Sequence, residues 1–473
     1  MRALFVTNQL KTGFYSPWAR AMEAAGAVIF WISTGERWTS YLVGQGWDRT
    51  RILDLSELGS RWTAPFKPSA EQASRIQRID EGAEIGLKNA LIMDRELALN
   101  PGWHIEAYGQ VVALEIERFV LDNDIRFAFG EDTWAPEIIT SAVMQANGRH
   151  FHAPHTIRIP SERFAFFPGV FQKRIDVFCE QPDVEHRAIA RQALANLRER
   201  GQRPYYFALN MNQNRLRNHW LDEAWRAVMQ PAGARFDHTM PSLRTRVGRR
   251  LASVLSGALA KRTGAFEAPP ETAERPFALF LLQKQPESSV DVIGAPFTNQ
   301  YEIIQALTRL LPFGWEMWVK EHPNAIGDRS PAYYRDLRRL PGIRLIDPFA
   351  DTHRLISRAG LTVSISGTAC FEAGLLGRPA ITIAEMYFGR VLLRNGFNPF
   401  QASHGDFAAI VDEAAAMTRA QAGSAIEDYL AWNVAQSFPG MISDPANVPS
   451  VIDPENVRNV ADATISFLQR LSR

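Results

Sequence analysis

The 473-residue chain is poor in cysteine, with only Cys179 and Cys370. Two thiols cannot form the disulfide framework on which small secreted domains depend, so the sequence gives no sign of an exported fold. No stretch reaches the roughly 18 apolar residues of a transmembrane helix. The apolar run in the N-terminal "MRALFVTNQ" is too short for a signal peptide. The sequence therefore predicts a soluble, cytoplasmic protein.

An excess of charge of one sign is also missing. The 52 Lys and Arg residues and the 51 Asp and Glu residues leave a formal net charge of +1. Because no overall field attracts a polyanion, we expect no nucleic-acid partner. Apolar side chains, in contrast, make up 46% of the residues, which is ample for a folded core. The length suggests two domains rather than one.

Short apolar runs alternate with helical stretches in two parts of the chain. Such alternation implies crossover connections and largely parallel sheets, so the predicted fold class is α/β with two doubly wound, Rossmann-like domains. One long, charged helical pattern is expected over residues 70–99, inside the first unit. The expected strands are 3–7, 27–32, 51–55, 125–129 and 149–153 in the first unit, and 277–282, 315–319, 343–346, 361–366 and 379–383 in the second.

The domain boundaries follow from composition. Residues 1–275 form the predicted N-terminal domain, with a helical insertion at about 170–270 that includes expected helices at 183–200 and 220–229. A stretch rich in Pro, Gly and Glu before residue 275 is typical of a linker. Residues 276–440 form the second domain, and 441–473 form a helical tail.

Two motifs end expected strands of the second domain. One strand stops in Lys320-Glu321-His322-Pro323, and another turns from Ser366 through Gly367 into a helix that begins near Thr368. A helix N-terminus presents unpaired backbone N–H groups and the positive end of the helix dipole. This arrangement is typical of an anion site, most often one for phosphate. Because strand ends of one sheet share an edge, the two motifs are expected to line a single nucleotide pocket.

Several segments of this region together resemble one protein family. They are "LLQKQPESSV", "NQYEIIQAL", "VKEHPN", the turn at Asp347 and Pro348, and "SGTACFEAGLLGRPAI". The combination resembles the capsule polysaccharide biosynthesis proteins that include bacterial β-Kdo transferases, most strongly over 277–384. The similarity continues more weakly in "GEDTW" and "APHTIRIPSERFAF". It implies a GT-B glycosyltransferase with two domains facing a cleft and a C-terminal tail that crosses back to the N-terminal domain.

The resemblance also implies roles on the donor side. The second domain would hold a nucleotide sugar, often a CMP-sugar, with His322 on the donor phosphate and helping the nucleotide to leave. Lys320 and an imidazolium can stabilise the charge that develops on a departing phosphate. The donor-side residues would be Lys320, Glu321, Pro323, Ser366, Gly367, Thr368 and Glu372, joined by Gln285, Glu287 and Ser288 unless the latter three only form a turn around Pro286.

The acceptor side depends on carboxylates that follow the strand expected at 125–129. Glu131 and Asp132 are candidates for a general base or a nucleophile, or one of them only caps the next helix. Arg158 and Arg163 are candidate cations near a charged substrate. The "HFHAPH" run invites a metal site, but no Cys or paired carboxylate completes one. We therefore expect His155 to line the cleft, and we expect no metal and no cofactor.

The segment at 241–262 combines helically spaced apolar residues with six basic residues and no acidic one. Such a helix is typical of a peripheral contact with the inner membrane, or of a helix packed on its own domain with a solvated basic face. The apolar positions are Leu243, Val247, Leu251, Val254, Leu255 and Leu259.

The sequence thus predicts a metal-independent glycosyltransferase of surface-polysaccharide synthesis. It would use a CMP- or UDP-sugar, such as CMP-Kdo, and a glycan or glycolipid acceptor. Two alternatives stay open: a nucleotide-sugar epimerase of the same fold, and a non-catalytic scaffold of a polysaccharide export complex.

Overall fold

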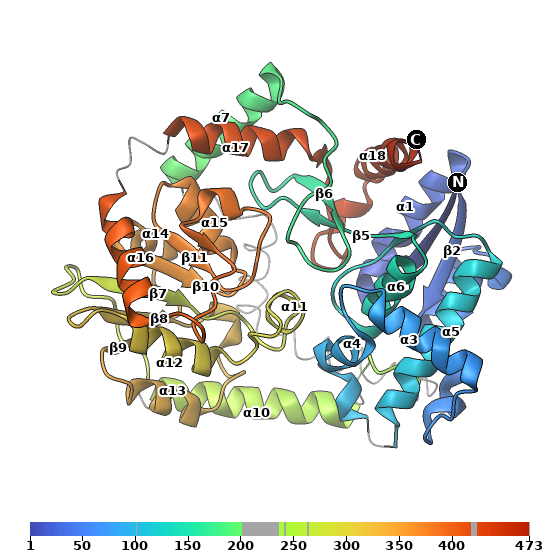
Figure 1. Cartoon of the computed structure of the whole chain (residues 1–473), viewed down its shortest axis with the longest axis horizontal. Helices are drawn as coiled ribbons and strands as arrows, with labels where there is room; N and C mark the ends of the chain where they lie inside the picture. Colours follow the sequence, from blue (N-terminus) through green and yellow to red (C-terminus); the bar gives the residue numbers. More distant parts are fainter. Residues whose placement is uncertain (101, 201–235, 241–242, 263, 418–422, 473) are drawn as a thin grey trace.

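The computed structural model describes the whole chain except residues 101, 201–235, 241–242, 263, 418–422 and 473. The described residues form two sheets with helices on both faces of each (Figure 1). This confirms the predicted fold class, a GT-B-like α/β fold with two doubly wound domains and a returning C-terminal helix. The helix expected at 220–229 lies outside the described residues.

The first sheet has the strand order β13-β6-β5-β4-β1-β2-β3. Its five parallel strands run in the order of a Rossmann half, and the strand order reverses between β1 and β4. The antiparallel edge strands β6 and β13 were not expected. The strands are β1 (Arg2–Val6), β2 (Val28–Ser33), β3 (Ile52–Asp54), β4 (Phe127–Phe129), β5 (His150–Thr156), β6 (Arg163–Pro168) and β13 (Phe438–Pro439).

The single helical pattern predicted over 70–99 is wrong. Helix α3 (Ala70–Glu81) ends before Gly82, and α4 (Leu87–Met93) begins after Gly86. Glycine favours helix ends over helix interiors, and a side chain at Gly82 would lie 3.2 Å from the Cα of Ala146. The other helices around this sheet are α1 (Thr12–Ala24), α2 (Glu36–Gly44), α5 (Ile105–Asp122) and α6 (Ala135–Ala146).

The second sheet has the order β12-β11-β10-β7-β8-β9 and is parallel throughout. The five predicted strands are confirmed, and its strand order reverses between β7 and β10. The strands are β7 (Phe277–Leu281), β8 (Glu316–Lys320), β9 (Ile343–Ile346), β10 (Leu361–Ser364), β11 (Ala380–Thr382) and β12 (Arg394–Asn395). The helices are α11 (Ser288–Asp291), α12 (Gln300–Leu310), α13 (Pro331–Arg338), α14 (Thr352–Arg358), α15 (Thr368–Leu375) and α16 (His404–Ala416).

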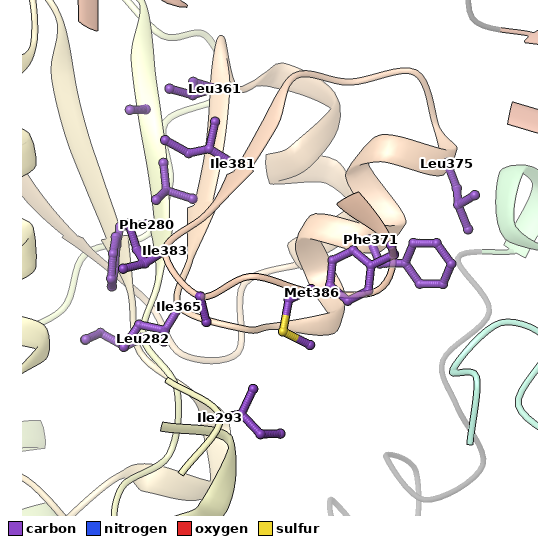
Figure 2. Packing of buried hydrophobic residues seen from close by; sticks show 14 of the residues in the cluster. Phe280, Leu282, Ile293, Leu361, Ile365, Phe371, Leu375, Ile381, Ile383 and Met386 are labelled. Atoms are coloured by element: carbon purple, nitrogen blue, oxygen red, sulfur yellow. The ribbon is translucent and has the colours of Figure 1, made fainter. Parts of the chain in front are cut away.

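The core of the second sheet fixes the two strand ends that carry the motifs. Phe280, Ile365 and Ile383 point toward one another, and Phe371 of α15 lies beside Met386 (Figure 2). All five side chains are at most 1% exposed. The turn between β10 and α15 is therefore held by buried apolar contacts on both sides.

Among the described residues, several helices connect the two halves of the molecule. Helix α7 (Val184–Arg200), from the predicted insertion, lies beside α17 (Gly423–Ala435), and α10 (Leu243–Arg262) extends along both halves (Figure 1). Helix α18 (Pro454–Leu471) returns to the first sheet. Within the described parts of the chain, no helix is both long and apolar enough to cross a membrane.

Candidate functional site

Polar residues gather where the strand order of the first sheet reverses. Asn8 and Lys11 follow β1, and Glu131 and Asp132 follow β4, the neighbouring strand. The carboxyl ends of strands at such a reversal are the usual place for a ligand in an open parallel sheet. Both predicted carboxylates thus lie at the position that the topology favours.

Glu131 is held by a cation and two hydrogen-bond donors. Its carboxylate forms an ion pair with Lys11, and it accepts hydrogen bonds from Asn8 Nδ2 at 2.9 Å and Thr133 Oγ1 at 3.3 Å. The Glu131 side chain is 16% exposed. Burial lowers the pKa of Lys11 to about 8, although the carboxylates of Asp132 and Glu137 oppose this shift. These contacts fix the orientation of the Glu131 carboxylate.

Glu137 provides the cap that the sequence left open for Glu131 or Asp132. Its Oε1 accepts hydrogen bonds from Glu131 N at 2.8 Å and Asn8 Nδ2 at 3.0 Å, and its Oε2 accepts one from Trp134 N at 3.1 Å. Because Glu137 satisfies the N-terminus of α6, the two carboxylates before the helix are not needed as caps.

Asp132 has few partners for a buried carboxylate. It is 2% exposed. Its Oδ2 accepts a long hydrogen bond of 3.4 Å from Gln172 Nε2, and its Oδ1 lies 3.6 Å from His155 Nε2. That histidine nitrogen is buried and makes no hydrogen bond within the described structure. Burial lowers the pKa of His155 to about 4, with Lys11 and Arg158 adding to the shift and Asp132 opposing it, so its imidazole is neutral at pH 7.

The second sheet places Ser366 next to Gln283 at its own reversal point. Gln283 follows β7, donates from Nε2 to Ser366 Oγ at 3.1 Å, and accepts from Ser366 N at 2.8 Å. Ser366 Oγ also donates to the carbonyl of Ser289 at 2.7 Å. The serine hydroxyl therefore supports the turn.

The turn after Ser366 presents a helix N-terminus. Gly367 is the N-cap of α15, donates its N–H to Ser364 Oγ at 2.9 Å, and has no side chain to cap the helix. The N–H groups of Thr368 and Ala369, in the first turn, have no carbonyl partner inside the helix. They are the groups of the predicted motif that suit an anion. Glu372 lies one turn further along α15 and is half-buried.

His322 follows β8, beside β7, and is the N-cap of a short 3-10 helix, Pro323–Ala325. Its Nδ1 accepts the N–H of Asn324 at 3.2 Å, so Nε2 carries the proton of the neutral ring. Burial lowers the pKa of His322 to about 4, and Lys320, Lys284 and Arg329 add to the shift. The His322 ring is therefore neutral at pH 7 and can donate a hydrogen bond from Nε2. The sequence had instead led us to expect a positively charged imidazolium.

Lys320 and Glu321 hold the motif together from inside. Lys320 Nζ donates to the Pro348 carbonyl at 2.7 Å. The Glu321 carboxylate pairs with Arg329 at 2.7 Å and accepts from Tyr334 Oη at 2.8 Å. Both side chains are buried, at 4% and 1% exposure. These contacts orient the strand end from which His322 projects.

The remaining donor-side candidates also make internal contacts. Gln285 donates to Asp291 Oδ1 at 2.7 Å and to the Thr298 carbonyl at 3.1 Å. Glu287 is the N-cap residue of α11 and accepts a hydrogen bond from Ser289 Oγ at 3.2 Å, and Ser288 is the first residue of that helix. These three residues thus form the turn around Pro286.

Arg158 and Arg163, which were predicted to lie near a charged substrate, occupy different parts of the structure. Arg158 Nη1 donates to the Ser366 carbonyl at 3.0 Å, and its Nη2 donates to Gln172 Oε1 at 3.0 Å. Since Gln172 contacts Asp132, a continuous path connects the carboxylate of the first sheet to the turn of the second. Arg163 instead donates to Ser437 Oγ at 2.8 Å and binds the backbone there, away from this path.

The histidines of the "HFHAPH" run point to different partners. His152 Nε2 lies 2.7 Å from Asp176 Oδ2, His150 stacks on Phe127, and His155 faces Asp132. In the described ranges, no three His, Cys, Asp or Glu side chains are grouped as metal ligands. A cavity of about 540 Å³ borders His150 and His152, and none of the predicted site residues lines it.

Sequence reasoning missed several residues of this network. Asn8 and Lys11 follow the first strand in "TNQLK", which reads as an ordinary loop. Gln283 lies within "LLQKQPE", a segment already noted for the family resemblance. For Gln172 and Glu137 the chain offers no local signal, because their partners are distant in sequence or belong to a cap.

No protein-family model matches the chain, and no curated protein matches it. Solved structures do. A beta Kdo 2,4 transferase, KpsC of Thermosulfurimonas dismutans, is 14% identical over 61% of this chain and 79% of its own, with a TM-score of 0.33. A UDP-GlcNAc 2-epimerase of Methanocaldococcus jannaschii, solved with UDP-GlcNAc and UDP, is 11% identical over 91% of this chain and 100% of its own, with a TM-score of 0.29. At such identities and scores, these similarities carry no argument about the reaction.

Proposed function

We propose that the protein is a glycosyltransferase that moves a sugar from a nucleotide-sugar donor to a glycan or glycolipid acceptor. The observation that carries the proposal is the path from Asp132 through Gln172 and Arg158 to Ser366. It connects a carboxylate suited to proton removal with a turn suited to phosphate. Transfer to a hydroxyl needs both groups near one reacting centre.

On the donor side, the proposal assigns the phosphate to the N–H groups at the start of α15 and to His322. A departing nucleotide gains negative charge, and oriented N–H donors stabilise that charge without reorganising. The proton on His322 Nε2 would be donated to a phosphate oxygen. A bound phosphate also raises the pKa of an imidazole beside it, which favours this donation. The charges that a metal ion would supply elsewhere come here from these donors.

On the acceptor side, Asp132 is our choice for the general base. Glu131 is already bound by Lys11, Asn8 and Thr133, whereas the side-chain contacts of Asp132 within the described residues include long ones with Gln172 and His155. A carboxylate oxygen with long contacts can exchange them for a shorter hydrogen bond from an acceptor hydroxyl, which is the geometry that proton removal needs. Glu131 and Lys11 would then set the local charge and orient the acceptor.

The family resemblance narrows the proposal further. It favours a CMP-sugar such as CMP-Kdo, and an acceptor of surface-polysaccharide synthesis, either capsular or of lipopolysaccharide type. A nucleotide-sugar epimerase is the second candidate, because its substrate presents the same phosphate.

The two reactions differ in what they need. A transferase releases nucleotide quickly only when an acceptor is present, whereas an epimerase acts on its nucleotide sugar alone. The experiment therefore measures nucleotide release from a panel of CMP- and UDP-sugars, with and without an acidic glycan or glycolipid. Acceptor-dependent release that Asp132→Asn lowers by about a hundredfold or more would support the proposal. Isomerisation without acceptor, or unaltered release by Asp132→Asn, would contradict it.

A further inference from the structure

Within the described residues, helix α10 packs on the protein along one face. Arg249 pairs with Glu96 through two contacts, at 2.6 and 3.0 Å. Gly257 is buried against Ile326 and Gly327. The two backbones lie close together here, because a Cβ added at Gly327 would be 2.1 Å from the carbonyl oxygen of Ser253. The inner face therefore carries a paired arginine and small residues, and it touches both halves of the molecule (Figure 1).

The opposite face of α10 is apolar and points to solvent. The exposed fractions are 46% for Val247, 59% for Leu251, 55% for Val254, 70% for Leu255 and 50% for Leu259. Steps of three and four residues place them on one stripe of the helix. A helix of a globular protein normally buries such a stripe against its own core. A continuous exposed stripe of this size instead indicates a contact surface.

The charge of residues 241–262 indicates which kind of partner the exposed stripe of α10 contacts. Residues 241–262 contain six basic residues and no acidic one: Arg244, Arg246, Arg249, Arg250, Lys261 and Arg262. Among these, Arg249 pairs with Glu96. Apolar side chains that enter the acyl boundary, together with cations near the headgroups, are the chemistry of a helix lying in the surface of an anionic bilayer.

We propose that α10 docks the protein on a membrane surface rich in anionic phospholipid, with Val247, Leu251, Val254, Leu255 and Leu259 inserted at the boundary of headgroups and acyl chains. A second copy of the chain fits this face less well. A symmetric dimer would bring two α10 helices, each rich in cations and without acidic residues, against each other. The docking itself does not depend on the transferase proposal.

Docking through α10 has one consequence that does rest on the proposed function. The helix contacts Gly327, five residues after His322, and it pairs with Glu96 of the first half. Both halves would thus lie at the bilayer, and a lipid-linked acceptor would reach the site without leaving the membrane. A soluble acceptor would gain nothing from docking.

The test is sedimentation of the full chain with vesicles of phosphatidylcholine mixed with phosphatidylglycerol, and with phosphatidylcholine alone. The test variant replaces Leu251, Leu255 and Leu259 by Gln, which keeps the helix but removes the apolar stripe. The wild type is expected to bind the anionic vesicles more strongly than the neutral ones. The triple variant is expected to bind at least about tenfold more weakly.

A matched control separates the stripe from general surface hydrophobicity. It replaces Val43, Leu121 and Val184, exposed residues of α2, α5 and α7, by Gln. This control is expected to bind vesicles like the wild type. A second variant, with Arg244 and Arg262 changed to Glu, is expected to lose the preference for anionic lipid. Equal vesicle binding by the wild type and the triple Gln variant would overturn the proposal. A wild-type dimer that the triple Gln substitution converts to monomers would also overturn it, because the stripe would then be a contact between two copies. Nucleotide binding by all variants tests the transferase proposal separately.

Discussion

At the scale of single residues, burial decides which side chains are charged. His155 and His322 both have a pKa near 4 because their surroundings exclude water and contain other cations. In the unfolded chain, each histidine has the ordinary pKa of about 6.5 and is therefore protonated at a higher pH than in the folded protein. Stability from keeping each ring neutral is therefore present above pH 6.5 and is lost as the pH falls toward 4.

His155→Gln tests this effect directly. We expect the free energy of unfolding of the wild type to fall, relative to the variant, by about 1 to 3 kcal/mol between pH 7 and pH 4.5. Urea unfolding at the two pH values measures the difference. His404→Gln, at an exposed position, is the control and should follow the wild type. Parallel pH curves for His155→Gln and wild type would show that burial does not hold the ring neutral.

Arg158 is expected to align the two halves and not to bind the donor phosphate. Lysine at this position keeps the charge but cannot bond the Ser366 carbonyl and Gln172 Oε1 at once. For Arg158→Lys we expect the transfer kcat to fall about tenfold or more. The dissociation constant of the donor should change less than about threefold, because the N–H groups of α15 remain in place. A much larger loss of donor affinity would instead make Arg158 a ligand of the donor phosphate.

The positions of His322 and of the Glu131-Asp132 pair at strand ends could be predicted from the sequence, because each follows a recognisable strand. Their partners could not. Asn8 and Glu131 are 123 positions apart, and Arg158 and Ser366 are 208 apart. Only the packing of strands from distant segments brings such side chains together, and no local pattern records it.

At the scale of elements, the packing of the C-terminal half of α15 needs a glycine. Gly374 lies where α15 crosses the backbone near Val391, and an added Cβ would meet the Val391 carbonyl oxygen at 2.4 Å. The helix can approach so closely only without a side chain. This contact gives a physical reason for the glycine in "CFEAG".

We expect Gly374→Ala to lower the free energy of unfolding by about 1 to 3 kcal/mol, because helix and loop must separate. Chemical denaturation measures the change. Gly405→Ala in α16 is the matched control, since its nearest neighbour would be 3.8 Å away. The control should be neutral or stabilised by up to about 1 kcal/mol. An equal effect of the two substitutions would remove the packing argument.

Most elements were predictable because their apolar runs and caps are local. The elements that were not predicted also have reasons that lie in the neighbouring sequence. Helices α3 and α4 are separated by Gly82 and Gly86, whose meaning as helix ends is lost in a long charged pattern. Strand β6 comes directly after β5 and runs antiparallel to it. The alternation of strands and helices in the sequence predicts only parallel neighbours.

At the scale of the whole molecule, the chain end closes the first domain. Phe467 of α18 stacks on Phe166 of β6 with ring centroids 4.2 Å apart, and Trp18 donates to Thr464 at 3.2 Å. The helix thus completes a core that begins with the first strand. A tail crossing back was implied by the family resemblance, and the described structure contains it.

Phe467→Ala should destabilise the first domain by about 3 to 5 kcal/mol, since it leaves a cavity between α18 and the sheet. Thermal unfolding followed by tryptophan fluorescence measures the loss. Ser466→Ala, at an exposed position of the same helix, should leave the melting temperature unchanged. If Phe467→Ala melted like the wild type, α18 would not be part of the core.

The central claim is that the second domain binds a nucleotide sugar through His322 and the start of α15. Calorimetric titration with a panel of CMP- and UDP-sugars tests it most directly, on the wild type, His322→Ala and the exposed-histidine control His404→Ala. We predict saturable binding of at least one nucleotide sugar by the wild type and the control, weakened at least about tenfold in His322→Ala. Absence of binding by the wild type, or equal affinity in His322→Ala, would contradict the account.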